Sequence, residues 1–259
     1  MAIAIAGMGP VGETIMDTLL EIPEYQKQVV ILTRKKEARD SFNQVEQVEV
    51  DYNDISSLAA SLEKHNIDTV ICAIGMISPE AGQSQVNLIQ AAEKSSVTKR
   101  FIPSEYSFVQ SEEILHLTPE VNLYIAANNA LKETRLKYTR IFPGYFMDYW
   151  GMPNVRTRLK PLAYAVDIPN RRAIIPGDGT KFEVSYDPLE KVKNNESTPL
   201  PQSDKVVYPP EIVSWVVSYM SQVAIVDGFK MPKDKRINNM FPDVKPVNMR
   251  EFLTNAWKA

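Results

Sequence analysis

The feature that most constrains this chain is a run of glycines close to its start. Gly7, Gly9 and Gly12 follow an apolar segment at residues 2–6 and open a segment, residues 11–22, in which apolar side chains recur every four positions. A strand, a G-x-G-x-x-G turn and a helix in this order form the arrangement that binds the pyrophosphate of a dinucleotide. The first glycine allows the tight turn, the second lets the backbone approach the phosphates, and the third lets the helix pack closely on the strand. The run therefore predicts a strand–turn–helix unit with a dinucleotide site, and the alternative is an ordinary strand–helix turn.

Strand and helix patterns continue to alternate up to residue 142. Such alternation predicts a doubly wound α/β fold with a parallel sheet. Beyond residue 150, where 12 of the 18 prolines lie, the alternation stops. We therefore expect a dinucleotide-binding domain over residues 1–150 and a smaller substrate or lid region over residues 151–259. Strands are predicted at residues 2–6, 28–32, 45–50, 69–74, 100–102 and 138–142, and helices at 11–22, 55–62, 86–92, 119–135, 212–223 and after the capping residue Asn248.

Charge and cysteine content exclude several classes of protein. The chain has 29 Lys and Arg against 32 Asp and Glu, and no basic run exceeds three residues, which argues against direct nucleic-acid binding. No apolar run approaches the roughly 20 residues that span a bilayer, so no membrane association is expected. The single cysteine, Cys72, lies in an apolar stretch and is expected in the core, and a cytoplasmic location follows as the default. The two histidines, His65 and His116, belong to no cluster with zinc spacing, so no metal is expected.

The residues after the second predicted strand indicate which dinucleotide is bound. A site that prefers NAD places Asp or Glu at this position to accept hydrogen bonds from the ribose 2′-hydroxyl. Here the strand ends in Thr33, Arg34, Lys35 and Lys36, and the guanidinium of Arg34 suits a 2′-phosphate. The sequence therefore predicts NADP, and the alternative is a solvated basic loop.

Three further loops follow the carboxyl ends of predicted strands, where ligands bind in open α/β sheets. Glu105, in one of these loops, is predicted to lie at the site, and the alternative is that it has a structural hydrogen-bonding role. Tyr145, Phe146, Tyr149 and Trp150 form a dense aromatic patch that suits a flat, aromatic substrate, although core packing accounts for part of it. The predicted cofactor-binding residues are Gly7, Gly9, Pro10, Val11, Gly12, Arg34, Lys35, Gly75, Met76, Pro103, Ser104, Glu105, Pro143, Gly144, Tyr145 and Phe146.

Longer motifs resemble a known family. The glycine run, residues 100–106 and residues 144–153 are similar to the fungal NmrA-like, isoflavone-reductase-like proteins, which are atypical short-chain dehydrogenases. The resemblance continues through residues 174–179 to residues 241–246 and so spans nearly the whole chain. It implies a Rossmann fold, NADP binding, and either reductase activity or a redox-sensing regulatory role.

The chain departs from this family at a catalytic position. Enzymes of the wider superfamily use Tyr-x-x-x-Lys, in which the tyrosine donates a proton and the lysine lowers its pKa and holds the ribose. The matching helix here has Tyr124 followed by Asn128, whose amide carries no charge. Lys132, one turn further on, is either a substitute or an exposed helix lysine. The candidate catalytic residues are therefore Tyr124, Asn128 and Tyr106.

A second departure is a gap. In the family, the segment that resembles Pro176 to Gly179 is followed by a strand, a helix and a short strand–helix unit. Here Thr180 joins it directly to residues 181–187, which match a later part of the family pattern. The missing piece would be roughly 50 residues, more than one strand–helix unit. Part of the core and of the pocket wall is therefore expected to be absent.

The sequence leaves three functions open. The leading expectation is an NADP-dependent reductase that acts on a small, aromatic or carbonyl-bearing metabolite, which the aromatic patch favours. Asn128 and the gap favour a non-catalytic NADP(H)-sensing regulator that acts through a protein partner. The third is a catalyst that retains NADP and performs non-redox chemistry.

Overall fold

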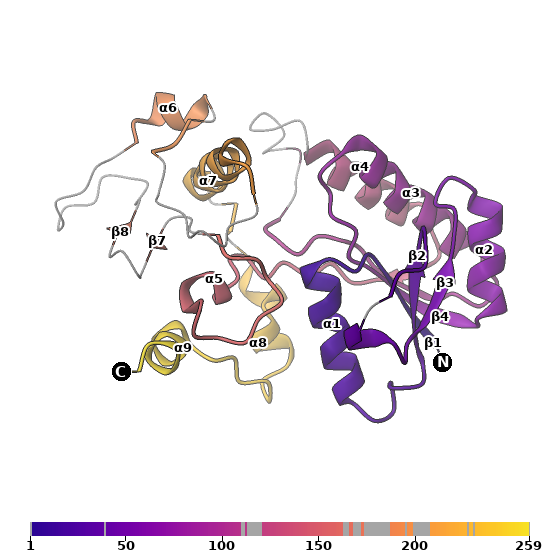
Figure 1. The fold of residues 1–259 in the computed structure, drawn as a ribbon. Coiled ribbons are helices and arrows are strands. Elements are labelled where there is room, and N and C mark those ends of the chain that lie inside the picture. The colour runs from indigo at the N-terminus through magenta and orange to yellow at the C-terminus, as the bar shows by residue number, and fades with distance from the viewer. Residues whose placement is uncertain are drawn as a thin grey trace. The chain divides into compact units, whose positions relative to one another are not determined.

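The structure of the chain is a computed structural model, and its described residues form two compact units (Figure 1). The first unit ends at Phe142 and the second begins at Pro143. The described residues are 2–38, 40–109, 112, 121–162, 166–167, 172–173, 187–194, 196–198, 208–226, 228–229 and 231–258.

The first unit is built on a six-stranded sheet in which all neighbouring strands are parallel (Figure 1). Its spatial order is β3-β2-β1-β4-β5-β6, so the direction in which strands are added reverses between β1 and β4. This order is the doubly wound arrangement that the sequence predicted, and it places a ligand crevice at the carboxyl ends of β1 and β4. The strands are β1 (Ala2–Ala6), β2 (Val29–Thr33), β3 (Glu46–Glu49), β4 (Ile67–Cys72), β5 (Arg100–Ile102) and β6 (Lys137–Tyr138).

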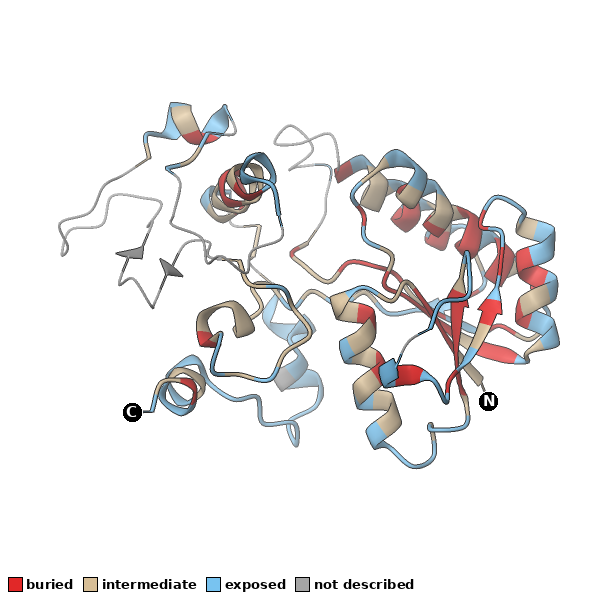
Figure 2. Ribbon diagram, in the orientation of Figure 1, coloured by how far each residue is buried: buried red, intermediate tan, exposed pale blue. Residues whose placement is uncertain are grey.

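Helices bury both faces of this sheet. Successive strand residues point to opposite faces, so apolar runs such as those of β1, β2 and β4 are needed where both faces are covered (Figure 2). Ile5, Ile31 and Ile71 pack with Met16 of α1 on one face, and Ala4, Val30 and Val70 belong to the core cluster on the other. The elements are α1 (Pro10–Glu21), the short helix η1 (Asp40–Phe42), α2 (Ile55–Lys64), α3 (Pro79–Lys94) and α4 (Val121–Lys132).

The sixth strand is shorter than the sequence predicted. β6 ends at Tyr138, whereas the apolar and β-branched run indicated a strand to Phe142. Its only sheet neighbour, β5, has three residues, and the last bond of this ladder runs from the Thr139 N–H to the Phe101 carbonyl, 3.1 Å. Beyond this point no strand of the described residues pairs with the chain, and Ile141 is exposed. The predicted start of α4 at Thr118 and Pro119 lies outside the described residues.

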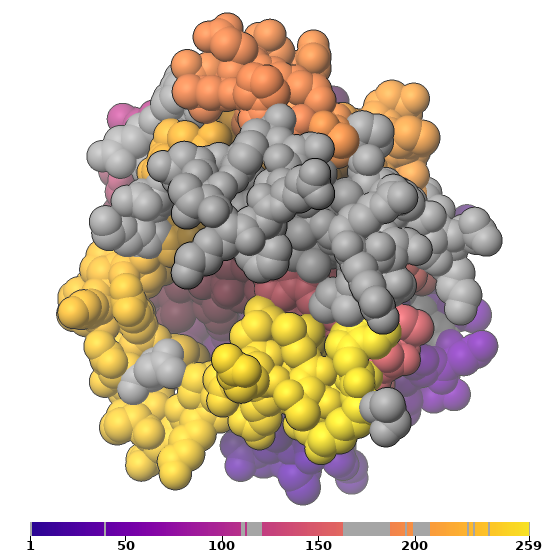
Figure 3. All heavy atoms as spheres, turned by 90° about the vertical axis from the view of Figure 1, so that its left-hand side faces the viewer, coloured from indigo at the N-terminus to yellow at the C-terminus, as the bar shows by residue number. Residues whose placement is uncertain are grey.

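The second unit has a small core of its own around α7. Val213 and Val217 on this helix pack against Tyr145, Tyr149 and Leu162. The predicted cap of the last helix is confirmed, because the Asn248 side chain accepts a hydrogen bond from the Glu251 N–H, and α9 lies at the surface that Figure 3 shows in yellow. The expected junction at Gly179 and Thr180 lies outside the described residues. The elements are α5 (Asp148–Gly151), the antiparallel pair β7 (Val166–Asp167) and β8 (Arg172–Ala173), α6 (Leu189–Lys193), α7 (Pro210–Ile225), the short helix η3 (Lys233–Lys235), α8 (Ile237–Met240) and α9 (Met249–Ala256).

Candidate functional site

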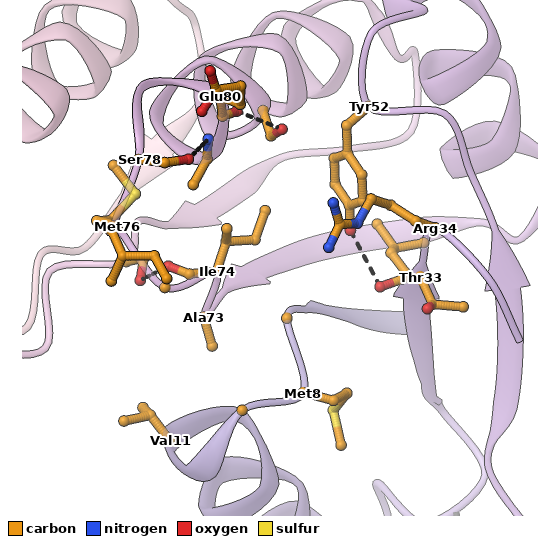
Figure 4. A pocket seen from close by; sticks show the side chains of 18 of the residues that line it. Met8, Val11, Thr33, Arg34, Tyr52, Ala73, Ile74, Met76, Ser78 and Glu80 are labelled. Atoms are coloured by element: carbon orange, nitrogen blue, oxygen red, sulfur yellow. Dashed lines mark hydrogen bonds between the residues drawn. The ribbon is translucent and has the colours of Figure 1, made fainter. Parts of the chain in front are cut away.

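A cavity of about 840 Å³ opens at the carboxyl ends of β1, β2, β4 and β5 (Figure 4). Its volume lies within the range of small-molecule and cofactor sites. All of its lining residues belong to the first unit. They are Gly7, Met8, Gly9, Pro10, Val11, Leu32, Thr33, Arg34, Lys35, Glu37, Tyr52, Ala73, Ile74, Gly75, Met76, Ile77, Ser78, Glu80, Ala81, Ser84, Ser104, Tyr106, Ser107 and Tyr124.

The three glycines of the first loop have different surroundings. Gly7 has a φ of +97°, and a Cβ there would lie 2.5 Å from the carbonyl carbon of Ala73. A Cβ on Gly12 would lie 2.0 Å from the carbonyl oxygen of Gly7, so the protein's own packing requires glycine at both positions. At Gly9, by contrast, no atom of the described residues lies within 4 Å of the Cβ position. The second glycine therefore leaves open space beside the backbone, as a dinucleotide phosphate requires.

The N-terminus of α1 faces this space. Gly9 is the residue that precedes the helix and has no side chain to cap it, and Pro10, the first helical residue, has no N–H. The next N–H groups of the first turn have no intrahelical acceptor, and the helix dipole makes this end partially positive. Backbone groups can therefore bind the pyrophosphate of a dinucleotide here.

Arg34 and Tyr52 mark one end of the cavity, where their side chains lie next to each other (Figure 4). Tyr52 donates a hydrogen bond to the Leu32 carbonyl, 3.1 Å, and burial raises the pKa of its hydroxyl, an effect that the positive charge of Arg34 partly opposes. Arg34 is exposed, and no carboxylate of the described residues forms an ion pair with it. Its guanidinium is therefore positioned to bind a phosphate group at the tip of β2.

In the middle of the cavity, hydrogen bonds of Gln85 and Ser104 connect the loops that line it. The buried Gln85 side chain accepts a hydrogen bond from the Ser104 N–H, 2.7 Å, and its amide lies 3.7 Å from the sulfur of Met76. The Ser104 hydroxyl donates to the Ile74 carbonyl, 2.8 Å. The loops after β4 and β5, which contain the predicted residues Gly75, Met76 and Ser104, are therefore joined through α3.

Two tyrosines line the side of the cavity away from Arg34, because β1 and β4 separate β2 from β5 in the sheet and Tyr106 follows β5. Tyr106 and Tyr124 both line the cavity, and the Tyr106 hydroxyl is buried with no hydrogen-bond partner among the described residues. Burial raises the pKa of Tyr106, and burial together with the negative charge of Glu105 raises the pKa of Tyr124 to about 12. Both hydroxyls therefore keep their protons at neutral pH and can act as hydrogen-bond donors to a ligand.

Asn128 and Glu105 were predicted at the site, but neither lines the cavity. The Glu105 carboxylate is buried and accepts hydrogen bonds from the Asn128 amide, 2.9 Å, and from the guanidinium of Arg140. Lys132, the candidate substitute for the missing lysine, is exposed and donates to the side chain of Asn129. The structure therefore gives Glu105 the structural hydrogen-bonding role, with Asn128 as one of its donors. Sequence reasoning missed Arg140, because no local motif connects it to Glu105.

Other predicted cofactor-binding residues lie elsewhere. Gly12 and Pro103 are adjacent to lining residues but outside the lining itself. Pro143, Gly144, Tyr145 and Phe146 belong to the second unit, where the Tyr145 ring stacks on Phe229 with centroids 4.5 Å apart. At least part of the aromatic patch is therefore core packing within the second unit.

The lining also contains residues that the sequence analysis did not single out. Ser78 caps α3 by accepting a hydrogen bond from the Ala81 N–H, 3.2 Å, and Glu80 and Ser84 follow on the same helix. A serine and a proline shortly after the fourth predicted strand are a signal for such a helix start, and this signal could have identified this part of the site. Within the described residues there is no His, Cys, Asp and Glu group that could hold a metal ion, and no helix long and apolar enough to cross a membrane.

Comparisons with known proteins agree with this geometry. A family model described as NAD(P)H-binding matches residues 7–162. Oxidoreductase BOA1 of Botryotinia fuckeliana is 37% identical over 179 residues, which cover 69% of this chain and 59% of that protein, so the chain spans about three fifths of this relative. A binary complex of leucoanthocyanidin reductase with NADPH from Vitis vinifera shares the fold, with a TM-score of 0.63 at 16% identity over 100% of both chains.

A further relative has additional residues. Oxidoreductase swnN of Arthroderma benhamiae is 32% identical over an alignment of 299 residues, which covers 83% of this chain and 92% of that protein. The alignment is longer than the 259 residues of the chain, so the relative contains residues with no counterpart here. This agrees with a shortened chain, and the place of the missing residues after Gly179 stays a prediction. The chain belongs to the NAD(P)H-binding family, in agreement with the resemblance of its motifs to the NmrA-like and isoflavone-reductase-like proteins.

Proposed function

We propose that the chain is an NADP-dependent reductase that acts on a small, aromatic or carbonyl-bearing molecule. The observation that carries this proposal is one continuous cavity with an arginine that has no ion pair among the described residues at one end, an open glycine loop in the middle and two protonated tyrosines at the other end. This order matches the order of groups in a nicotinamide dinucleotide, from the 2′-phosphate through the pyrophosphate to the reactive ring.

Each part of the cavity has a separate task in this proposal. Gly9 and the N-terminus of α1 bind the pyrophosphate, and Arg34 with Lys35 binds the 2′-phosphate. NADPH supplies the hydride when it is bound. Tyr106 is our preferred donor to the substrate oxygen because its buried hydroxyl has no other partner among the described residues, and Tyr124 is the second candidate.

Cofactor preference provides the first test. Replacing Arg34 by Ala should raise the dissociation constant of NADPH by roughly 10- to 100-fold and change that of NADH far less, because only NADPH has the 2′-phosphate. Both constants are measured by fluorescence titration. The matched control is Lys36→Ala, which removes a neighbouring exposed cation outside the lining. Equal losses for NADPH and NADH would contradict the assignment.

Turnover provides the second test. NADPH oxidation is followed in the presence of a panel of aromatic ketones and unsaturated carbonyl compounds, with the Tyr106→Phe and Tyr124→Phe variants measured in parallel. We expect the Tyr106 variant to lose more activity, by roughly 100-fold or more, as is typical for loss of a general acid. Tight NADPH binding without oxidation of any compound would contradict the reductase.

One observation favours a second candidate, a non-catalytic sensor of NADP(H). Asn128 stands where catalytic relatives carry lysine, and its amide is bonded to Glu105 instead of reaching the cavity. A sensor must distinguish the oxidised from the reduced cofactor. A large difference between the NADP⁺ and NADPH dissociation constants, together with no turnover, would favour this candidate over the reductase.

A further inference from the structure

A buried carboxylate lies directly behind the tyrosine end of the cavity. Glu105 is 1% exposed and stands between Ser104 and Tyr106, which both line the cavity, while Glu105 itself does not. Its Oε1 accepts a hydrogen bond from the Asn128 amide and one from Arg140 Nη2, both 2.9 Å, and its Oε2 accepts one from Arg140 Nε. Three donors from two other segments therefore converge on one carboxylate.

Arginine is well suited to stabilise the buried Glu105 carboxylate. A buried carboxylate without a cation is strongly destabilising, and the planar fork of an arginine can bind both carboxylate oxygens in a fixed geometry. Arg140 lies two residues after the end of β6, next to Thr139, whose N–H is bonded to the Phe101 carbonyl. The guanidinium is thus anchored at the edge of the sheet and reaches across 35 residues of sequence to Glu105.

The two segments bonded to each other through this carboxylate, the loop after β5 and helix α4, each contain one tyrosine of the cavity lining. Glu105 directly precedes Tyr106 in the loop after β5, and Asn128 lies one helical turn from Tyr124 on α4. The Glu105 carboxylate therefore links the loop that bears one tyrosine to the helix that bears the other. We propose that Arg140 is a positioning residue which, through Glu105 and Asn128, sets the spacing of Tyr106 and Tyr124 in the cavity that it does not itself line.

The consequence for turnover rests on the proposed reductase, but the spacing itself can be measured without cofactor or substrate. The protein is labelled with 3-fluorotyrosine, and the ¹⁹F NMR signals of the two residues are assigned with the Tyr106→Phe and Tyr124→Phe variants. We expect Arg140→Gln to shift or broaden both signals and to raise the dissociation constant of NADPH by about tenfold, since Tyr106 and Tyr124 line the site. Unchanged signals of both tyrosines in a folded Arg140→Gln protein would overturn the proposal.

A second arginine of the same unit offers a matched control. Arg135 binds Glu93, and its guanidinium donates to the carbonyls of Thr98 and Ser95, away from the cavity lining. Arg135→Gln should destabilise the fold but leave the two tyrosine signals and the NADPH affinity within about twofold of the unmodified protein. Equal changes of the tyrosine signals in the two arginine variants would also overturn the proposal, because the effect would then be one of stability.

Two further variants keep the proposal testable if Arg140→Gln does not fold. Arg140→Lys retains the charge and removes the fork, and the double variant Glu105→Gln/Arg140→Gln removes both charges together. If the pair positions the tyrosines, both variants fold while the two signals stay displaced. Recovery of both signals in the double variant would overturn the proposal, because the pair would then serve only to neutralise charge. Absence of turnover in every variant would count against the reductase and would leave these signals interpretable.

Discussion

The two ends of the cavity are built in different ways. The glycine loop and the tip of β2 are short, continuous segments that supply backbone groups in the middle of the cavity and an exposed cation at the Arg34 end, where, among the described residues, only Tyr52 comes from a separate segment of the sequence. At the tyrosine end, Tyr106 and Tyr124 come from separate elements, and their support includes a buried ion pair between residues 35 positions apart. The difference teaches that the first end is encoded locally, whereas the second depends on long-range contacts. It also predicts which substitutions harm binding alone and which harm the fold.

The largest effect is expected within the glycine loop, where neighbouring positions should behave in opposite ways. Gly12→Ala places a Cβ 2.0 Å from the Gly7 carbonyl oxygen, so backbone must move, and we expect the free energy of unfolding to fall by about 3 kcal/mol or more. Gly9→Ala meets no atom of the described residues within 4 Å and should leave that free energy nearly unchanged while weakening NADPH binding. Urea unfolding and NADPH titration of both variants measure the two effects. If Gly9→Ala unfolds the protein and Gly12→Ala does not, the roles assigned to the two glycines are contradicted.

A smaller effect is expected from the hydrogen bond that holds the loop after β5, which leads from the middle of the cavity to Tyr106. Gln85→Leu leaves the buried N–H of Ser104 without its acceptor, which should lower the free energy of unfolding by about 1–3 kcal/mol. The matched control is Gln90→Leu, on the exposed face of the same helix, which should cost less than about 0.5 kcal/mol. Urea midpoints of the two variants are compared. Equal midpoints would show that the loop after β5 does not depend on Gln85.

The same contrast explains how much the sequence could predict. Gly7, Gly9 and Arg34 follow from local motifs, and the doubly wound parallel sheet follows from the alternation of strands and helices; the structure places the three residues in one cavity. Arg140 could not be found, because only the sheet brings the end of β6 next to the loop after β5. Arg140 was instead predicted to lie within a strand over residues 138–142. Apolar periodicity does not reveal that β5, with three residues, is too short to pair with a strand of that length.

Asn128 illustrates the limit of a motif more sharply. Its match to the lysine position of the family's Tyr-x-x-x-Lys pattern, four residues after Tyr124, predicted both residues at the catalytic site. In the structure Tyr124 lines the cavity, whereas the Asn128 amide is directed to Glu105. Helical spacing predicts that two side chains are neighbours, but it does not determine which buried partner each one finds.

Alkaline pH should reveal the burial of the tyrosine end with little effect near neutrality. Burial raises the pKa of the Cys72 thiol to about 12, and Cys72 is close enough to Tyr106 for a thiolate charge there to raise the pKa of that hydroxyl as well. The pKa in the folded state lies above that of an unfolded thiol, about 8.5, so the protonated thiol stabilises the fold fully below that pH, and this contribution is lost as the pH rises toward 12. Tyr124 adds a similar loss between about pH 10 and pH 12.

This behaviour can be measured at the single cysteine of the chain. At pH 8 the folded protein should not react with a disulfide reagent on the time scale of a free thiol, and the reaction rate should follow global unfolding because the thiol is buried. Urea midpoints should be constant from pH 7 to pH 8 and fall above pH 9, and the fall between pH 9 and pH 10 should be shallower in Cys72→Ala. Rapid labelling of the folded protein at pH 8 would mean that the carboxyl end of β4 opens locally. Because Cys72 lies close enough to affect the pKa of both Tyr52 and Tyr106, such an opening would reach both ends of the cavity, and the two ends would then differ in sequence distance but not in dynamics.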